Sequence, residues 1–159
     1  GLGIAQALPN ARVMAVELSE KALVWLQKNV NGYAKTHKNA PEVVRADVFA
    51  YYEEVLPESF DLILSNPPYV RERAYAKLAQ ELYFEPKEAL VASEEGLAFY
   101  KAIARNYGPA LKKGGWLVFE LGAGQGKEVA ELLFENGCNN IGLEQDYAHK
   151  DRIAMGKKA

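Results

Sequence analysis

The chain has 159 residues, which is the size of one domain and enough to bury a sizeable core. With 49% hydrophobic and 25% charged residues, its composition is that of an ordinary globular domain. The net charge of -2 argues against a non-specific nucleic-acid binder, which needs a basic face. We therefore expect no direct nucleic-acid binding, although a local basic patch is compatible with this net charge.

Cysteine and histidine are scarce. Cys138 is the single cysteine, so an internal disulfide and a cysteine-based metal cluster are excluded. The two histidines, His37 and His149, are too scattered to predict a metal site. No apolar run approaches the ~18 residues of a membrane span, and no signal-peptide pattern is present. We expect a cytoplasmic protein with no metal and no membrane partner.

Hydrophobic patterns predict strands and helices that alternate along the whole chain. In chain order we expect a helix at 1–8, a strand at 12–17, a helix at 20–30, a strand at 42–46, a helical turn within 49–56, a strand at 60–65, a helix at 96–111, a strand at 116–121, a helix at 127–135, and strands at 140–145 and 152–157. This order predicts an α/β fold with a mostly parallel sheet covered on both faces. The last two strands have no helix between them, so we expect a hairpin that makes one edge strand antiparallel.

Some element ends carry their own signals. Ser19 is a suitable N-cap for the helix at 20–30, and Asn31-Gly32 predicts the end of that helix. The charged segment 70–85 is suited to a mobile lid.

The stretch at 60–69, FDLILSNPPY, organises the rest of the chain. Its first six residues read as a strand buried on both faces. Pro67 and Pro68 then remove two backbone donors and stop the strand. The result is a stiff loop at the carboxyl end of a strand, which is where open α/β sheets bind ligands.

The loop at 66–69 has the chemistry to hold a planar NH2 group. The Asn66 side-chain oxygen and the Pro67 carbonyl are two acceptors, and the Tyr69 ring is a flat face for the same group or for a cation. Such a pocket suits alkylation of an amide or exocyclic amine nitrogen. The alternative is a polyproline turn that only caps the strand; because a buried strand precedes the loop, we favour the functional interpretation.

Two acids follow the earlier strands. Glu17 is placed to accept both hydroxyls of a ribose, and Asp47 an adenine amino group, with Val48 or Phe49 against the ring. Alternatively, Glu17 is a solvated acid beside Ser19, and Asp47 caps the turn that follows it. Three acid or amide residues at three successive strand ends favour one shared crevice formed by Glu17, Asp47 and Asn66.

Glycine-rich turns give a weaker signal. The turn that should precede Glu17 by ~20 residues is absent. A second cluster at 122–126 (GAGQG) follows a strand and opens a helix, so it could bind phosphate. With Glu120 beside it and no downstream ribose acid, we predict a tight structural turn there.

Across essentially its whole length the chain resembles the N5-glutamine methyltransferases of the HemK/PrmC type. The resemblance is carried by Asn66-Pro67-Pro68-Tyr69, Phe84-Glu85-Pro86, Ala89-Leu90, Glu95-Gly96-Leu97, Tyr100, Gly114-Gly115, Glu120-Leu121-Gly122, Gln125-Gly126, Asp146-Tyr147 and Asp151-Arg152. The Asn-Pro-Pro-Tyr match alone also fits nucleic-acid adenine-N6 methyltransferases. The resemblance over the stretch from Glu85 to Leu97 favours the methyltransferases that act on glutamine.

The resemblance implies a Rossmann-like class I methyltransferase that transfers a methyl group from S-adenosyl-L-methionine to the glutamine of the Gly-Gly-Gln loop of peptide-chain release factors. It implies cofactor binding by Glu17, Asp47, Val48 and Asn66, and catalysis by Asn66, Pro67 and Tyr69. It implies substrate binding by Asn66, Pro67, Pro68, Tyr69, Glu85 and Pro86.

The family's first strand, its glycine-rich turn and its helical amino-terminal domain would all precede Gly1. We therefore expect residues 1–159 to be a catalytic domain that is incomplete at its amino terminus and poorly active alone. His149 also stands where the family usually has glycine, so that turn is expected to differ. The competing hypotheses are an adenine-N6 methyltransferase, which needs a base-sized pocket for a flipped base, and an inactive binding module.

Overall fold

A computed structural model describes all 159 residues. The chain divides into two compact units, residues 1–53 and residues 54–159, and each is described by itself. None of the helices is both long and apolar enough to cross a bilayer.

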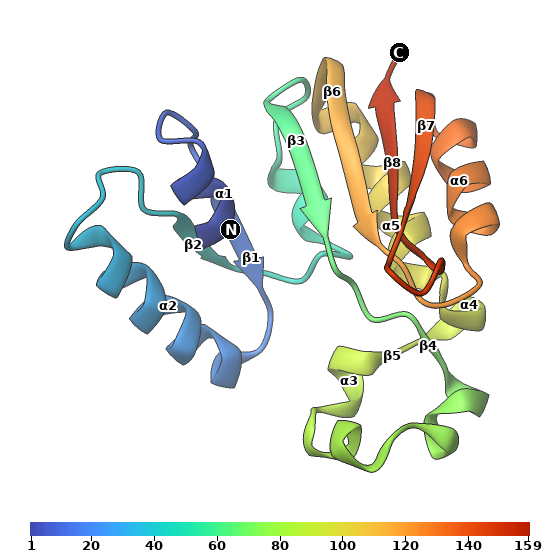
Figure 1. Ribbon diagram of the computed structural model, residues 1–159. Coiled ribbons are helices and arrows are strands. Elements are labelled where there is room, and N and C mark those ends of the chain that lie inside the picture. Colours follow the sequence, from blue (N-terminus) through green and yellow to red (C-terminus); the bar gives the residue numbers. More distant parts are fainter. The chain divides into compact units, whose positions relative to one another are not determined.

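Unit 1 is a pair of parallel strands with two helices. Its elements are α1 (Leu2–Ala7), β1 (Met14–Glu17), α2 (Glu20–Ala34) and β2 (Glu42–Arg45), and the 3-10 helix η1 (Tyr51–Glu54) follows (Figure 1). The register runs from Met14 opposite Glu42 to Glu17 opposite Arg45, so both strands end at the same edge of the sheet. Val16 is 40% exposed, so β1 is not fully buried within unit 1.

Helix α2 begins as the sequence predicts but ends later. The Ser19 hydroxyl oxygen accepts a hydrogen bond from the Ala22 N–H at 3.3 Å, which confirms the N-cap. The predicted end at Asn31-Gly32 was wrong, because the helix continues to Ala34. Gln27 donates to the Asn31 side chain at 2.9 Å, a contact between neighbours one turn apart that favours helix at this point.

Unit 2 is built on a four-stranded sheet. Its strands are β3 (Phe60–Ser65), β6 (Leu111–Glu120), β7 (Cys138–Gln145) and β8 (Asp151–Lys158), in the spatial order β3-β6-β8-β7. β3 and β6 are parallel, whereas β8 is antiparallel to both of its neighbours. The hairpin is confirmed, but its antiparallel strand is not at the edge: β8 lies between β6 and β7 (Figure 1).

Two helices cover this sheet and complete the core of unit 2. They are α5 (Ala98–Tyr107), which is followed by the 3-10 helix η4 (Gly108–Ala110), and α6 (Gly126–Glu135). Tyr100, Ile103, Ala104 and Tyr107 of α5 are all buried, as expected for residues at helical spacing on one apolar face. The Tyr100 ring meets the Phe119 ring edge to face at 5.2 Å between centroids, which joins α5 to β6.

β3 has the predicted bounds but not the predicted burial. It pairs only with β6 and stands at the edge of its sheet, with Leu62 37% and Leu64 55% exposed. The prediction that this strand is buried on both faces was therefore wrong for unit 2. Gly114 and Gly115 lie at a bulge within β6, where pairing jumps from Leu111 opposite Phe60 to Trp116 opposite Leu62.

Residues 66–97 form an excursion from the sheet. It contains a small parallel pair, β4 (Val70–Arg71) with β5 (Val91–Ala92), and the short helices η2 (Glu72–Lys77), η3 (Gln80–Phe84), α3 (Lys87–Leu90) and α4 (Ser93–Gly96) (Figure 1). Lys87 forms an ion pair with Glu72 at 2.5 Å, and the Tyr75 and Tyr83 rings meet edge to face at 5.3 Å. That this segment moves as a lid stays a prediction.

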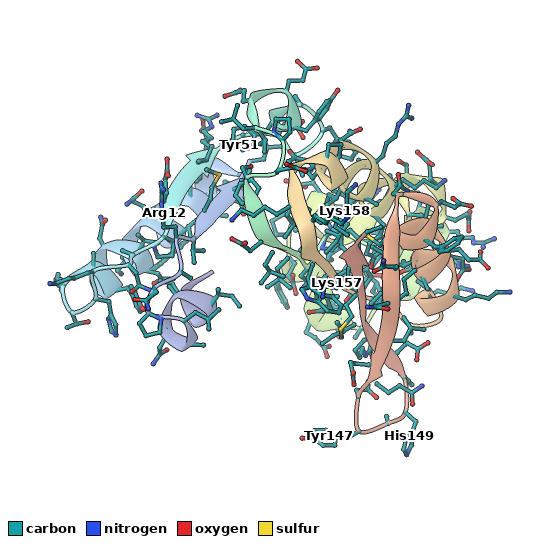
Figure 2. The ribbon with its side chains drawn as sticks, turned by 90° about the horizontal axis from the view of Figure 1, so that it is seen from above. Arg12, Tyr51, Tyr147, His149, Lys157 and Lys158 are labelled. Carbon is teal, nitrogen blue, oxygen red and sulfur yellow. The ribbon has the colours of Figure 1, made fainter.

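The β7–β8 hairpin ends in an exposed tip. Tyr147 and His149 lie at this tip, with Lys157 and Lys158 farther along β8 (Figure 2). His149 has a φ of 55°, in the left-handed region that glycine adopts most easily. Histidine thus occupies the backbone conformation that glycine would favour there.

Candidate active site

The loop of residues 66–69 follows the carboxyl end of β3 and leads directly into β4. The Asn66 side chain is exposed and therefore open to a ligand, whereas Pro67 is buried and Pro68 and Tyr69 are half-buried. The two prolines thus fix the backbone while the amide stays accessible.

Both backbone polar groups of Tyr69 are held by other segments. Its N–H donates to the Leu90 carbonyl at 3.2 Å, next to the β4–β5 pair. Its carbonyl accepts from the Gln125 side-chain Nε2 at 3.3 Å. The ring packs so closely against Gly122 that a Cβ added there would lie 2.8 Å from Tyr69 Cδ2. The end of the loop is therefore fixed by two anchors.

The environment of Tyr69 favours a neutral phenol. Partial burial raises the pKa of its hydroxyl, the negative charges of Glu120 and Glu85 raise it further, and the positive charge of Arg152 opposes them. Tyr69 therefore presents an uncharged ring and an O–H donor, not a base. This fits a packing role beside a reacting group.

A second tyrosine supports the loop that faces Tyr69. The Tyr100 hydroxyl donates to the Glu120 carbonyl at 2.9 Å, and the Tyr100 side chain has no exposed surface. Burial raises the pKa of this hydroxyl far above its ordinary value. Tyr100 therefore fixes the end of β6, from which the turn with Gly122 and Gln125 begins.

Glu85 and Pro86 are exposed and lie between η3 and α3. The charge of Glu85 acts on Tyr69, and Leu90, at the end of α3, accepts the Tyr69 N–H. The structure thus brings the segment that starts at Glu85 to the loop of residues 66–69.

The two acids of unit 1 lie at the same edge of its small sheet. Glu17 ends β1, is half-buried, and accepts the Ser19 N–H at 2.7 Å. Asp47 lies two residues beyond β2, is exposed, and accepts the Phe49 N–H at 2.9 Å through Oδ1. Each carboxylate therefore performs the local structural role given above as its alternative. Each also keeps a second oxygen for a ligand, and Val48 is half-buried beside Asp47. The crevice shared with Asn66 stays a prediction.

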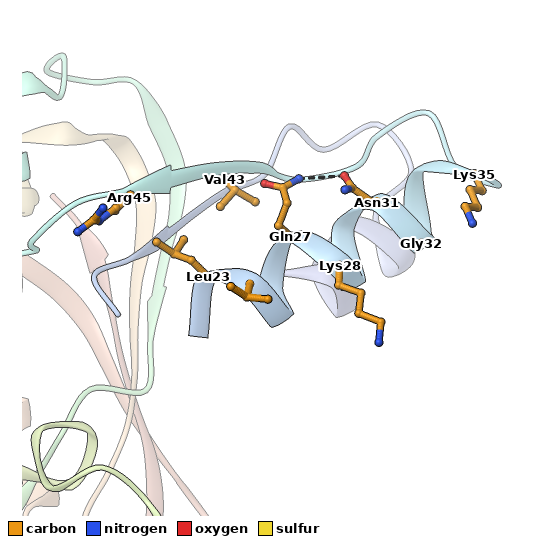
Figure 3. A pocket seen from close by; sticks show the side chains of 9 residues that line it. Leu23, Gln27, Lys28, Asn31, Gly32, Lys35, Val43 and Arg45 are labelled. Carbon is orange, nitrogen blue, oxygen red and sulfur yellow. Dashed lines mark hydrogen bonds between the residues drawn. The ribbon is translucent and has the colours of Figure 1, made fainter. Parts of the chain in front are cut away.

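A hollow on the surface of unit 1 lies between α2 and β2 (Figure 3). Its lining includes Leu23, Gln27, Asn31, Val43 and Arg45. It reaches Arg45, the last residue of β2, but its lining contains none of the predicted site residues. We assign it no part in the site.

Gln125 is among the residues that carry the resemblance, but the sequence predicted no role in the site for its side chain. The tight turn predicted at 122–126 is present, with the Gln125 N–H donating to the Gly122 carbonyl at 3.2 Å. The Gln125 side chain, however, is 3% exposed and reaches the Tyr69 carbonyl. The available signal was a single amide side chain among small residues at the start of a helix.

No group of three or more His, Cys, Asp or Glu side chains is arranged to hold a metal ion.

Residues 1–114 match the family model described as "Methyltransferase small domain". The chain belongs to the methyltransferase small domain family. The chain is 35% identical to a release factor glutamine methyltransferase of Vibrio cholerae, over 98% of this chain and 53% of that protein. It is 32% identical to a release factor glutamine methyltransferase of Fusobacterium nucleatum, over 99% of this chain and 44% of that protein. The chain thus spans about half the length of these curated relatives.

Solved structures agree with the fold of a methyltransferase small domain. A methyltransferase from Pyrococcus furiosus superposes with a TM-score of 0.68 at 16% identity, over 99% of this chain and 68% of that chain. A magnesium protoporphyrin IX methyltransferase from Synechocystis superposes with a TM-score of 0.58 at 17% identity, over 100% of this chain and 64% of that chain. The predicted Rossmann-like α/β class is confirmed.

Proposed function

We propose that residues 1–159 form the catalytic domain of a protein-glutamine N-methyltransferase. The proposed reaction transfers a methyl group from S-adenosyl-L-methionine to the side-chain amide nitrogen of a glutamine in the Gly-Gly-Gln loop of a peptide-chain release factor. Release factors act in translation termination, so the proposed location is the cytoplasm. The names of the relatives from Vibrio cholerae and Fusobacterium nucleatum support the substrate.

One observation carries this proposal: an exposed amide side chain stands on a loop whose two ends are fixed. Asn66 directly follows β3, and Tyr69 is held through both its N–H and its carbonyl. A rigid loop can present Asn66 Oδ1 and the Pro67 carbonyl to the two hydrogens of a planar NH2 group. The half-buried, neutral Tyr69 ring can pack against the same group.

The residues of unit 1 fit the proposed cofactor. Glu17 uses one oxygen for the Ser19 N–H, which leaves a second acceptor for a ribose hydroxyl. Asp47 likewise keeps Oδ2 for an amino group, and Val48 provides apolar surface. When bound, S-adenosyl-L-methionine supplies an electrophilic methyl group attached to a positively charged sulfur.

This chain contributes binding and orientation of the acceptor. An amide nitrogen is a weak nucleophile because its lone pair is delocalised into the carbonyl. Two acceptors on its N–H bonds draw off positive charge and fix the direction of the lone pair, and positioning of this kind supplies a large part of a barrier reduction. Methylation replaces one N–H by N–CH3, so one proton must leave. Asn66 is exposed, so that proton can pass to water.

The test is Asn66→Ala in protein expressed from its complete coding sequence. A release factor and a peptide containing Gly-Gly-Gln are offered with S-adenosyl-L-methionine, and methylated glutamine is measured by mass spectrometry. We expect transfer to fall by at least about 100-fold while cofactor affinity changes little, because the acceptor for the substrate amide is lost. Asn31→Ala, at an exposed position in α2, is the matched control and should retain activity.

Two results would contradict the proposal. Transfer by Asn66→Ala at the rate of the unchanged protein would remove the role of the loop. Methylation of adenine in a single-stranded oligonucleotide, with the glutamine untouched, would replace the substrate class.

A further inference from the structure

The Gln125 side chain is a buried amide that makes no hydrogen bond within its own helix. It occupies the N-cap position of α6, but its side chain makes no capping hydrogen bond. Its backbone N–H donates to Gly122 at 3.2 Å and its carbonyl accepts from Val129 at 3.0 Å. The turn and the helix are therefore complete without the side chain.

The Gln125 side chain instead joins two distant segments. Nε2 lies 3.3 Å from the Tyr69 carbonyl, 56 residues earlier, and 3.5 Å from the Gly96 carbonyl, 29 residues earlier. Because both neighbours are carbonyl oxygens, only the NH2 end of the amide can pair with them. One side chain thus links the loop of residues 66–69, the end of α4 and the start of α6.

Stability alone gives a poor reason for an amide here. Gln125 Oε1 is buried and has no hydrogen-bond partner, and a buried polar atom without a partner destabilises the fold. The Gln125 side chain fits only because residue 96 is glycine: a Cβ at Gly96 would lie 2.7 Å from Gln125 Nε2.

We propose that Gln125 is a positioning residue for methyl transfer, which rests on the function proposed above. By holding the Tyr69 carbonyl, its NH2 group fixes the end of the loop whose start carries Asn66 and the Pro67 carbonyl. The Tyr69 N–H to the Leu90 carbonyl and the pairing of Val70 with Val91 hold the same point from the β5 side. Without the Gln125 donor the Tyr69 carbonyl loses its contact with the α6 side, and the stiff prolines transmit any tilt of this peptide group to the two acceptors of the substrate amide.

The experiment compares Gln125→Met and Gln125→Glu in protein expressed from its complete coding sequence. Methionine keeps the length and removes both donors together with the unpartnered oxygen. We expect kcat with a Gly-Gly-Gln peptide to fall about 10- to 100-fold, with KM and cofactor affinity nearly unchanged. We expect the Tm to stay within about 3 °C. Gln27→Met, on the exposed side of α2, is the matched control. A kcat within about 2-fold of the unchanged protein refutes the proposal.

Gln125→Glu gives a test by pH that does not depend on the methionine variant folding. A carboxylate repels the two carbonyls, whereas the protonated acid donates one hydrogen to them. Because burial raises the pKa of a carboxyl group, the activity of Gln125→Glu relative to the unchanged protein should rise as the pH is lowered from about 9 to about 6. We call the hydrogen bond from Gln125 Nε2 to the Tyr69 carbonyl the tether. If the activity of Gln125→Glu relative to the unchanged protein does not depend on pH, the proposed role of the tether is refuted.

A third measurement separates this proposal from the proposed function. The carbonyl 13C resonance of Tyr69 reports its hydrogen bond whether or not any methyl group is transferred. If it shifts in Gln125→Met, the tether is supported even where the unchanged protein is inactive, and then it is the proposed function that fails. If it does not shift, the tether is refuted even in an active enzyme.

Discussion

Gly96 and Gly124 form a matched pair for testing how closely the loop of residues 66–69 is packed. Both have left-handed backbones, with φ of 85° and 79°. A Cβ at Gly96 would collide with the Tyr69 carbonyl oxygen and lie 2.7 Å from Gln125 Nε2, whereas a Cβ at Gly124 would meet nothing within 4 Å. The two positions therefore share the cost of the backbone and differ in the collision.

The expected magnitudes follow from these two terms. Placing alanine in the left-handed region costs about 1–2 kcal/mol, and this applies to both Gly96→Ala and Gly124→Ala. Overpacking against fixed backbone adds about 1–3 kcal/mol at Gly96 alone. We expect Gly124→Ala to lower the free energy of unfolding by about 1–2 kcal/mol and Gly96→Ala by about 2–5 kcal/mol.

The assay is urea unfolding followed by tryptophan fluorescence. The chain has two tryptophans, so a Trp25→Phe background leaves Trp116, on β6, as the sole reporter on unit 2. Equal losses of stability in the two alanine variants, within about 0.5 kcal/mol, would refute the close approach of Gly96 to the Tyr69 carbonyl.

Two further predictions concern Tyr100, which supports the site, and Asp146, in the turn between β7 and β8. Tyr100→Phe should lower the free energy of unfolding by about 1–2 kcal/mol, because it leaves the Glu120 carbonyl without the hydroxyl donor now 2.9 Å away. Since burial raises the pKa of the Tyr100 hydroxyl, the unfolded chain ionises first, and the unchanged protein should lose stability above about pH 10. Urea unfolding between about pH 8 and pH 11 should show a smaller alkaline loss in Tyr100→Phe, and an identical loss would contradict this role. At the other end of the pH scale, the Arg152 side chain and the backbone N–H groups of Lys150 and Ala148 lower the pKa of the Asp146 carboxyl. Its contribution is present above the unfolded pKa and is lost as the pH falls through the folded pKa, so thermal melts below about pH 4 should show a steeper loss in the unchanged protein than in Asp146→Asn.

Several secondary-structure features of this chain could be predicted from the sequence, because they depend on local steric rules. The end of β3 at Ser65 follows from the two prolines, whose geometry needs no tertiary partner. The buried stripe of α5 follows from helical spacing, and the β7–β8 hairpin follows from the short polar stretch between two strands. The chemistry of the loop at 66–69 was also readable, since Asn66 and the Pro67 carbonyl are acceptors whatever surrounds them.

Only the tertiary structure decided the contacts between distant segments. The place of β8 between β6 and β7 and the exposure of β3 at a sheet edge depend on which strands pair, and nothing local to those strands specifies that choice. The tether joins Gln125 to the carbonyl of Tyr69, 56 residues earlier in the chain. The turn and helix signals around Gln125 do not reveal that this carbonyl lies beside it. The sequence thus determines which hydrogen bonds each residue is able to make, whereas long-range packing determines which of them form. The reason is that a buried amide can pair only with the groups that the fold brings next to it.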